Sequence, residues 1–198
     1  MEYKSFILIM MGAALSNNYV LRQFLGICPF LGVSKEIKSA AGMGVSVMAV
    51  MLMATAVIWP IQIFLLDKYH LGYLQTVVFI LIIAALVQIV EIAVKRFVPP
   101  LYKSLGIYLP LIATNCALFA VTLVNVRHGY TFLESIVNAL GAGLGFFLAM
   151  TVFAGIREQT RSADPPRSFK GLPITLISAA ILSLAFFGFN GVAENLLG

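Results

Sequence analysis

The sequence contains two cysteines, Cys28 and Cys116, and each lies within or beside an apolar run. Cys28 belongs to residues 26–32 (GICPFLG), a stretch that holds a proline and has a glycine at each end. Cys116 follows Asn115 and comes six residues after Pro110. Proline and glycine interrupt helices, so we expect both thiols at breaks in the backbone, where they can face an internal site.

The chemistry open to these two thiols depends on the ligands around them. Their apolar surroundings favour free thiols or metal ligation over a structural disulfide. A zinc site needs four ligands, and His70 and His128 are expected in loops away from both cysteines, which also makes haem binding improbable. An iron–sulfur cluster normally takes four cysteines, so this chain could hold only half of one, with a second subunit supplying the rest. The alternative is that each cysteine simply packs as a small apolar side chain.

The composition describes the surroundings of these residues. Of 198 residues, 61% are hydrophobic and only 11% are charged, whereas a soluble domain carries about 25% charged residues. So few charges cannot cover a globular surface in water. The net charge of +5 comes from short basic loops between apolar runs, which excludes a nucleic-acid-binding surface and indicates an integral membrane protein.

A membrane-spanning helix needs roughly 20 mostly apolar residues. The sequence therefore predicts an all-α, polytopic membrane protein with six spans, at about residues 5–24, 40–66, 71–97, 105–126, 132–156 and 172–192. With six spans, ten Lys and Arg residues fall on one side of the membrane and three on the other. By the positive-inside rule the basic side is cytoplasmic, so we expect both termini outside the cytoplasm of a bacterial cell.

The chain forms a single membrane domain that we divide near two consecutive prolines into halves, residues 1–98 and 99–198. One half has Cys28 at the end of its first span, and the other has Cys116 within its first span. In each half a Gly-x-Gly pair then opens the second span, ending at Gly44 and Gly143. Met51 and Met150 also correspond when these glycines are aligned. Because each half has three spans, the second copy must be inverted, and inverted repeats place interrupted helices near the membrane midplane.

Glu91 is the clearest charge within a predicted span. Charged groups in the membrane are costly and are commonly functional, so Glu91 is a candidate for an ion pathway. The simpler interpretation is a surface pair with Lys95, which lies four residues further along the same helix.

Several stretches of the sequence resemble the A subunits of the Rnf ion-translocating electron transport complexes. The matching stretches, spread over essentially the whole chain, are NNYVL at 17–21, FLGICPFLGVSK at 24–35, GMG at 42–44, LGIYLPL at 105–111, TNCA at 114–117, IRE at 156–158 and SLAF at 183–186. The related E subunit of sodium-pumping NADH:quinone reductases is the nearest alternative.

The resemblance implies a fold, a cofactor and partners. It implies that Cys28 and Cys116 bind the iron of an intramembrane [2Fe–2S] cluster, shared with a homologous E-type subunit that supplies two further cysteines. It implies that other subunits (B, C, D and G) carry flavins and further iron–sulfur clusters. It also implies a translocase of the inner membrane that couples electron flow between ferredoxin and NAD to Na⁺ or H⁺ transport, in which this chain is not catalytic alone. A secondary transporter or channel without a redox centre, and a purely structural scaffold, remain the alternatives.

Overall fold

The computed structural model describes residues 2–16, 18–34, 37–69, 72–97, 112, 114–162, 166, 169 and 171–188. All the regular elements in these ranges are helices, which confirms the all-α class. Three of them are long and apolar enough to cross a membrane, over Ile37–Asp67, Gly72–Ala93 and Phe132–Arg161. Cys116–Arg127 and Leu172–Phe187 are shorter apolar helices.

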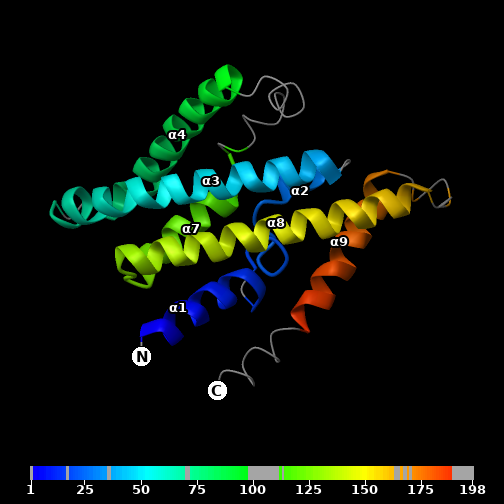
Figure 1. Cartoon of the computed structure of the whole chain (residues 1–198), viewed down its shortest axis with the longest axis horizontal. Coiled ribbons are helices and arrows are strands. Elements are labelled where there is room, and N and C mark those ends of the chain that lie inside the picture. The colour runs from blue at the N-terminus through cyan, green and yellow to red at the C-terminus, as the bar shows by residue number, and fades with distance from the viewer. Residues whose placement is uncertain are drawn as a thin grey trace.

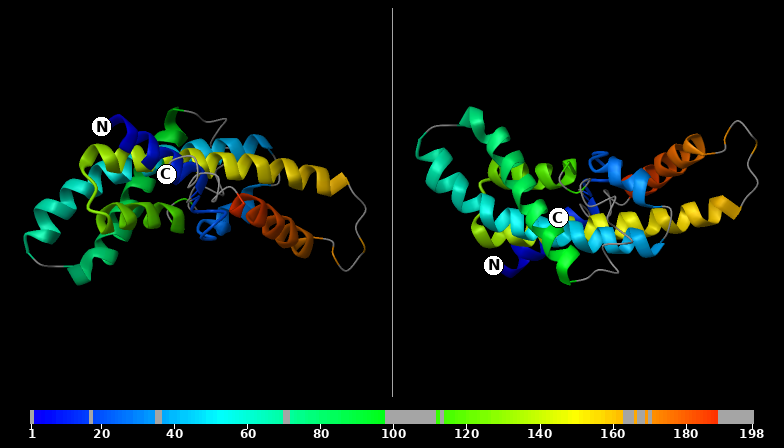
Figure 2. Two further views of the ribbon diagram at one scale, coloured as in Figure 1. Left: turned by 90° about the horizontal axis from the view of Figure 1, so that it is seen from below. Right: turned by 90° about the horizontal axis from the view of Figure 1, so that it is seen from above.

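Helices α3 (Ile37–Ile61) and α8 (Phe132–Ser162) form the centre of the molecule. They lie side by side and run in opposite directions (Figures 1 and 2). Each helix corresponds to the second predicted span of its half of the sequence. Opposite directions are what the predicted inverted repeat requires of these two helices, but the repeat itself stays a prediction, and its boundary between residues 98 and 99 falls outside the described residues.

Glycine allows α3 and α8 to approach closely, and it does so reciprocally. A Cβ placed on Gly44 of α3 would lie 2.7 Å from Cδ2 of Phe147 on α8. A Cβ placed on Gly143 of α8 would lie 2.6 Å from Cγ of Met48 on α3. On each helix the large residue follows the glycine by four residues, which is about one turn. Gly44 of α3 therefore receives Phe147 of α8, and one turn away Gly143 of α8 receives Met48 of α3.

The remaining helices pack around this pair. Helix α1 (Glu2–Met11) and the π-helical turn η1 (Gly12–Ser16) lie on α8, where Gly141 and Gly145 leave room for their backbone. Helix α4 (Gln75–Phe97) and α7 (Cys116–Arg127) lie on α3. Helix α9 (Leu172–Phe187) follows α8 and packs on it (Figure 1).

The predicted span boundaries hold well in some places and differ in others. Helix α3 continues through Pro60 into a π-helical turn (Gln62–Asp67), matching the second predicted span, and α4 ends at Phe97 as expected. Helix α8 runs six residues beyond the predicted end of the fifth span. The first predicted span is interrupted, as expected, but the interruption comes earlier than expected, because the helical structure stops at Ser16 and resumes at Ile27. The physical cause is Asn18, described below.

Candidate functional site

Each cysteine lies in the first turn of a helix that follows a break. Cys28 is the second residue of α2 (Ile27–Val33), and Cys116 is the first residue of α7. The prediction that both thiols stand at interruptions is therefore confirmed. Both are free cysteines, with the Cys28 side chain exposed and that of Cys116 half-buried.

A direct hydrogen bond joins the two cysteine segments. The backbone N–H of Gly26 donates to Sγ of Cys116 over 2.8 Å, across 90 residues of sequence. Cys28 follows Gly26 by two residues, and two residues of fully extended chain reach at most about 7 Å. The backbone of Cys28 therefore lies within about this distance of the amide that bonds to Cys116. The fold thus brings the two thiol-bearing turns together.

Gly26 has a backbone conformation that explains its residue type. Its φ of 87° lies in the left-handed region, where side chains with a Cβ are strained. A Cβ here would also lie 3.1 Å from Oδ1 of Asn115 and 3.1 Å from Cε2 of Phe146. Glycine is therefore required both by the turn into α2 and by its close approach to the start of α7.

The break itself lies earlier than the sequence suggested. We expected the helix to stop within residues 26–32, but α2 occupies 27–33 and the irregular backbone lies between Asn18 and Gly26. Pro29 is the third residue of α2, and proline is tolerated in a first turn because those amides need no intrahelical acceptor. Proline therefore marks where the second segment begins rather than where the chain breaks.

Asn18 holds the break open with both ends of its side-chain amide. Its Oδ1 accepts from the N–H groups of Val20 (3.0 Å) and Leu21 (3.4 Å). Its Nδ2 donates to the carbonyl oxygens of Ala14 (3.2 Å) and Gly145 (2.9 Å). Asn18 thus replaces helical hydrogen bonds on both sides of the break and ties the break to α8, which satisfies backbone groups that lipid could not.

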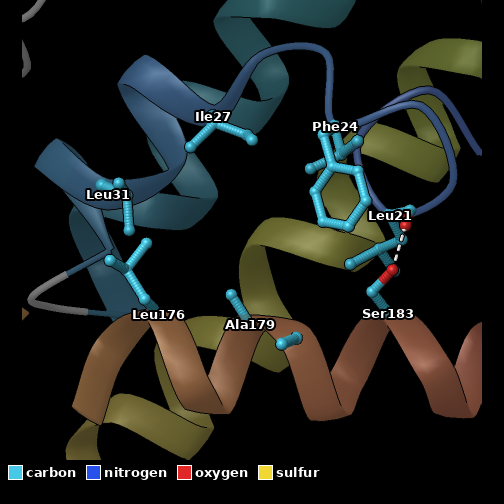
Figure 3. A pocket seen from close by; sticks show the side chains of 9 residues that line it. Leu21, Phe24, Ile27, Leu31, Leu176, Ala179 and Ser183 are labelled. Carbon is cyan, nitrogen blue, oxygen red and sulfur yellow. Dashed lines mark hydrogen bonds between the residues drawn. The ribbon is translucent and has the colours of Figure 1, made fainter. Parts of the chain in front are cut away.

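The segment between Asn18 and α2 also faces α9. Ser183 of α9 donates its hydroxyl to the carbonyl oxygen of Leu21 (Figure 3). Beside this bond lies an almost wholly apolar cavity of about 90 Å³. The break, α2 and α9 line it with the side chains of Val20, Leu21, Phe24, Ile27, Leu31, Leu176, Ala179, Ala180 and Ser183.

Asn115 fixes the start of α7. Its backbone is extended, and its Oδ1 accepts from the N–H of Ala117 over 3.0 Å, which caps the helix. This cap sets the start of α7 at Cys116, whereas residues 105–111, where the fourth predicted span begins, lie outside the described residues. The other end of the side chain, Nδ2, is buried and has no hydrogen-bond partner within the described part of the chain. Pro110, which we expected to mark this break, lies outside the described residues.

Arg157 holds the other end of α2. Its Nη1 donates to the carbonyl oxygen of Leu31 over 2.7 Å and to Oγ of Ser34 over 2.8 Å. In the sequence, Arg157 is one of the ten basic residues that predict the orientation in the membrane, directly after the fifth predicted span. Its hydrogen-bond partners lie more than 120 residues away and cannot be identified from local sequence.

The remaining candidate, Glu91, lies on α4. It continues a stripe of α4 that is formed by the buried side chains of Phe79, Ile83 and Val87. Glu91 itself is half-buried, and Lys95 is exposed. An ion-pathway role for Glu91 therefore stays a prediction.

The donor set distinguishes between kinds of metal centre. No group of three or more His, Cys, Asp and Glu side chains that could hold an ion occurs among the described residues. His128 stacks on Tyr130 in the turn between α7 and α8, away from the cysteines, while His70 lies outside the described residues. Two free thiols on neighbouring turns, one receiving a backbone N–H and the other exposed, fit half of a cluster whose other ligands come from elsewhere.

Comparison with known proteins gives matches over nearly the whole chain. Residues 6–193 match the family described as "Rnf-Nqr subunit, membrane protein". The A subunit of the Na⁺-translocating ferredoxin:NAD⁺ oxidoreductase complex of Acetobacterium woodii is 53% identical, over 94% of this chain and 97% of the relative. The A subunit of the ion-translocating oxidoreductase complex of Syntrophotalea carbinolica is 51% identical, over 97% of this chain and 100% of the relative. Its counterpart from Serratia proteamaculans is 49% identical, over 96% and 98%.

Proposed function

The chain belongs to the Rnf-Nqr family of membrane subunits, and from this premise we propose that it is the A subunit of an ion-translocating oxidoreductase complex. In this role it holds half of an intramembrane [2Fe–2S] cluster through Cys28 and Cys116. The observation that carries the proposal is the hydrogen bond from Gly26 N–H to Cys116 Sγ, which joins the two cysteine segments.

The second half of the cluster site belongs to a homologous E-type subunit that contributes two further cysteines. Cys28 is exposed, so its thiol is accessible to another chain at this face. Two thiolates cannot complete the four-ligand set of a cluster, which makes the partner obligatory. When bound, the cluster supplies a one-electron carrier within the membrane.

The residues of this chain prepare the site for anionic sulfur. The Gly26 amide donates to Cys116 Sγ and so stabilises negative charge on that ligand. The N-terminus of α7 places the positive end of a helix dipole at the same thiol. Asn18 and Arg157 hold the two ends of the segment that carries Cys28.

The wider assembly follows from the same proposal. The Acetobacterium relative is named for Na⁺ translocation and ferredoxin:NAD⁺ oxidoreduction, and we assign this chain to a complex of that type that moves Na⁺ or H⁺. Its partners are the B, C, D and G subunits, with their flavins and clusters, together with the E-type subunit. The complex resides in the bacterial inner membrane, with both termini of this chain outside the cytoplasm and Glu91 as a candidate in the ion pathway.

The test compares the purified complex with its Cys28→Ser and Cys116→Ser variants by EPR spectroscopy and iron analysis. Each variant should lose one cluster signal and about two iron atoms per complex, the content of one [2Fe–2S] cluster. Ser178→Ala is the matched control, since Ser178 bonds within its own helix, to the carbonyl oxygen of Ile174. Unchanged signals in both cysteine variants would remove the redox role and favour a transporter that does not need the thiols.

A further inference from the structure

Arg157 makes a contact that its place in the membrane charge pattern does not explain. It lies on α8, and one of its guanidinium nitrogens, Nη1, donates to both Leu31 O and Ser34 Oγ. Leu31 is in the last turn of α2, and Ser34 is the residue that ends this helix and is completely buried. A cation of the second half of the chain thus closes the C-terminal end of the helix that carries Cys28.

Helix α2 depends on contacts with the rest of the chain to stay in place. It contains seven residues, and a helix this short does not persist through its own hydrogen bonds. Cys28 is exposed, while Ile27 and Leu31 border the cavity towards α9 (Figure 3). Among the described contacts of α2, Leu31 packs against the hydrophobic core, and polar contacts hold the two ends of the helix.

The two ends of α2 are held in complementary ways. At the N-terminal end, Gly26 donates its N–H to Cys116 Sγ. At the C-terminal end, carbonyl oxygens without an intrahelical partner carry partial negative charge and favour a cation. Arg157 supplies that cation, and its fixed planar group can bind two acceptors at once, which an ammonium group does with less geometric restraint.

We propose that Arg157 is the positioning residue for Cys28: by clamping the end of α2 to α8, it fixes where this thiol stands in the cluster site. The proposal rests on the proposed function for what Cys28 binds, and on the two contacts of Arg157 for how Cys28 is held. Arg161 provides the comparison, because it is an exposed basic residue one turn further along α8. Both arginines serve orientation in the membrane, but Arg157 is the one that has these contacts with α2.

The experiment is hydrogen–deuterium exchange, followed by mass spectrometry, on the intact complex carrying Arg157→Leu, Arg157→Lys, Ser34→Ala or Arg161→Leu. In Arg157→Leu, peptides covering α2 should exchange about tenfold or more faster, as expected for the loss of charge-assisted hydrogen bonds, while peptides of α7 stay as in the wild type. Arg157→Lys should restore most of the protection, and Ser34→Ala should lie between, because the Leu31 carbonyl still accepts. The cluster EPR signal should broaden in Arg157→Leu and recover its shape in Arg157→Lys.

The controls separate this proposal from a general effect of charge and from the proposed function. Wild-type exchange of α2 in Arg157→Leu, or equal acceleration in Arg161→Leu, would overturn it. If Arg157→Leu does not assemble, Ser34→Ala decides, because it removes one of the two acceptors of Arg157, and wild-type α2 exchange in this variant would overturn the proposal. A wild-type complex without a cluster at this site would refute the proposed function, yet exchange of α2 would still decide whether Arg157 is its clamp.

Discussion

Gly26 and Cys116 lie 90 residues apart in sequence, yet the backbone N–H of the first donates to Sγ of the second. The bond joins a left-handed turn in one half of the chain to the first residue of a helix in the other. Each segment carries one of the two cysteines, and this contact holds the two segments together. The geometry of the thiol pair is therefore a property of how the two halves meet.

Gly26→Ala should disturb this meeting point. The added Cβ would be strained at a φ of 87° and would press on Asn115 and Phe146, so the amide should move away from Cys116. Losing an N–H donor to a ligand sulfur makes reduction less favourable, and we expect the cluster potential to fall or the cluster to be lost. An EPR-monitored redox titration of the complex measures this. Gly32→Ala in α2 is the control, since a Cβ there meets nothing within 4 Å; equal potentials in the two variants would contradict the assignment.

Asn18→Ala should destabilise the broken segment. The change removes four hydrogen bonds, two of them to backbone amides that lipid cannot satisfy. We expect a loss of about 2–4 kcal/mol, the sum of one or two unsatisfied buried groups. Thermal unfolding of the complex in detergent measures it. Thr151→Ala, whose hydroxyl bonds to Phe147 O in its own helix, should change the midpoint little, and a similar small change for Asn18→Ala would show that the break holds itself without this side chain.

Gly44→Ala should weaken the contact between α3 and α8. The new methyl group would lie 2.7 Å from the Phe147 ring and 3.2 Å from its Cα, so the helices must separate. Overpacking of this kind costs about 1–3 kcal/mol. Adding Phe147→Leu should recover part of the loss in thermal stability. Gly155→Ala in α8 has open space around it and should be neutral or stabilising, and a Gly44→Ala protein as stable as that control would argue against close packing.

Glu91→Gln tests the ion-pathway prediction. Glu91 extends the buried stripe of α4, and neutralising a carboxylate that binds the transported ion should lower the number of ions moved per electron. Ion uptake by vesicles containing the complex is compared at matched electron flux. Glu158→Gln, at an exposed position near the end of α8, is the control. Equal stoichiometry in Glu91→Gln and wild type would leave Glu91 with a structural role only.

Local sequence predicted the interruptions but not the side chains that maintain them. Glycine and proline near Cys28 correctly indicated a break, because their effect on the backbone is intrinsic. The exact place was missed because Asn18, and not Pro29, ends the helical structure, using a carbonyl oxygen of Gly145 that is 127 residues away.

The same limit applies to Arg157. Its charge was visible in the sequence, whereas its bonds to Leu31 and Ser34 exist only because α8 passes the end of α2. The close glycine packing was predictable in kind, since small residues favour helix contact in membranes. Its reciprocal register between Gly44 and Gly143 was not, because that depends on the relative shift of two helices.

The reciprocal glycines of α3 and α8 also limit which amino-acid substitutions the contact between these helices tolerates. The space for Phe147 is the missing side chain of Gly44, and the space for Met48 is the missing side chain of Gly143. A larger residue in place of Gly44 or Gly143 costs least when the opposing side chain, Phe147 or Met48 respectively, becomes smaller. Substitutions at this crossing are therefore coupled between the two helices.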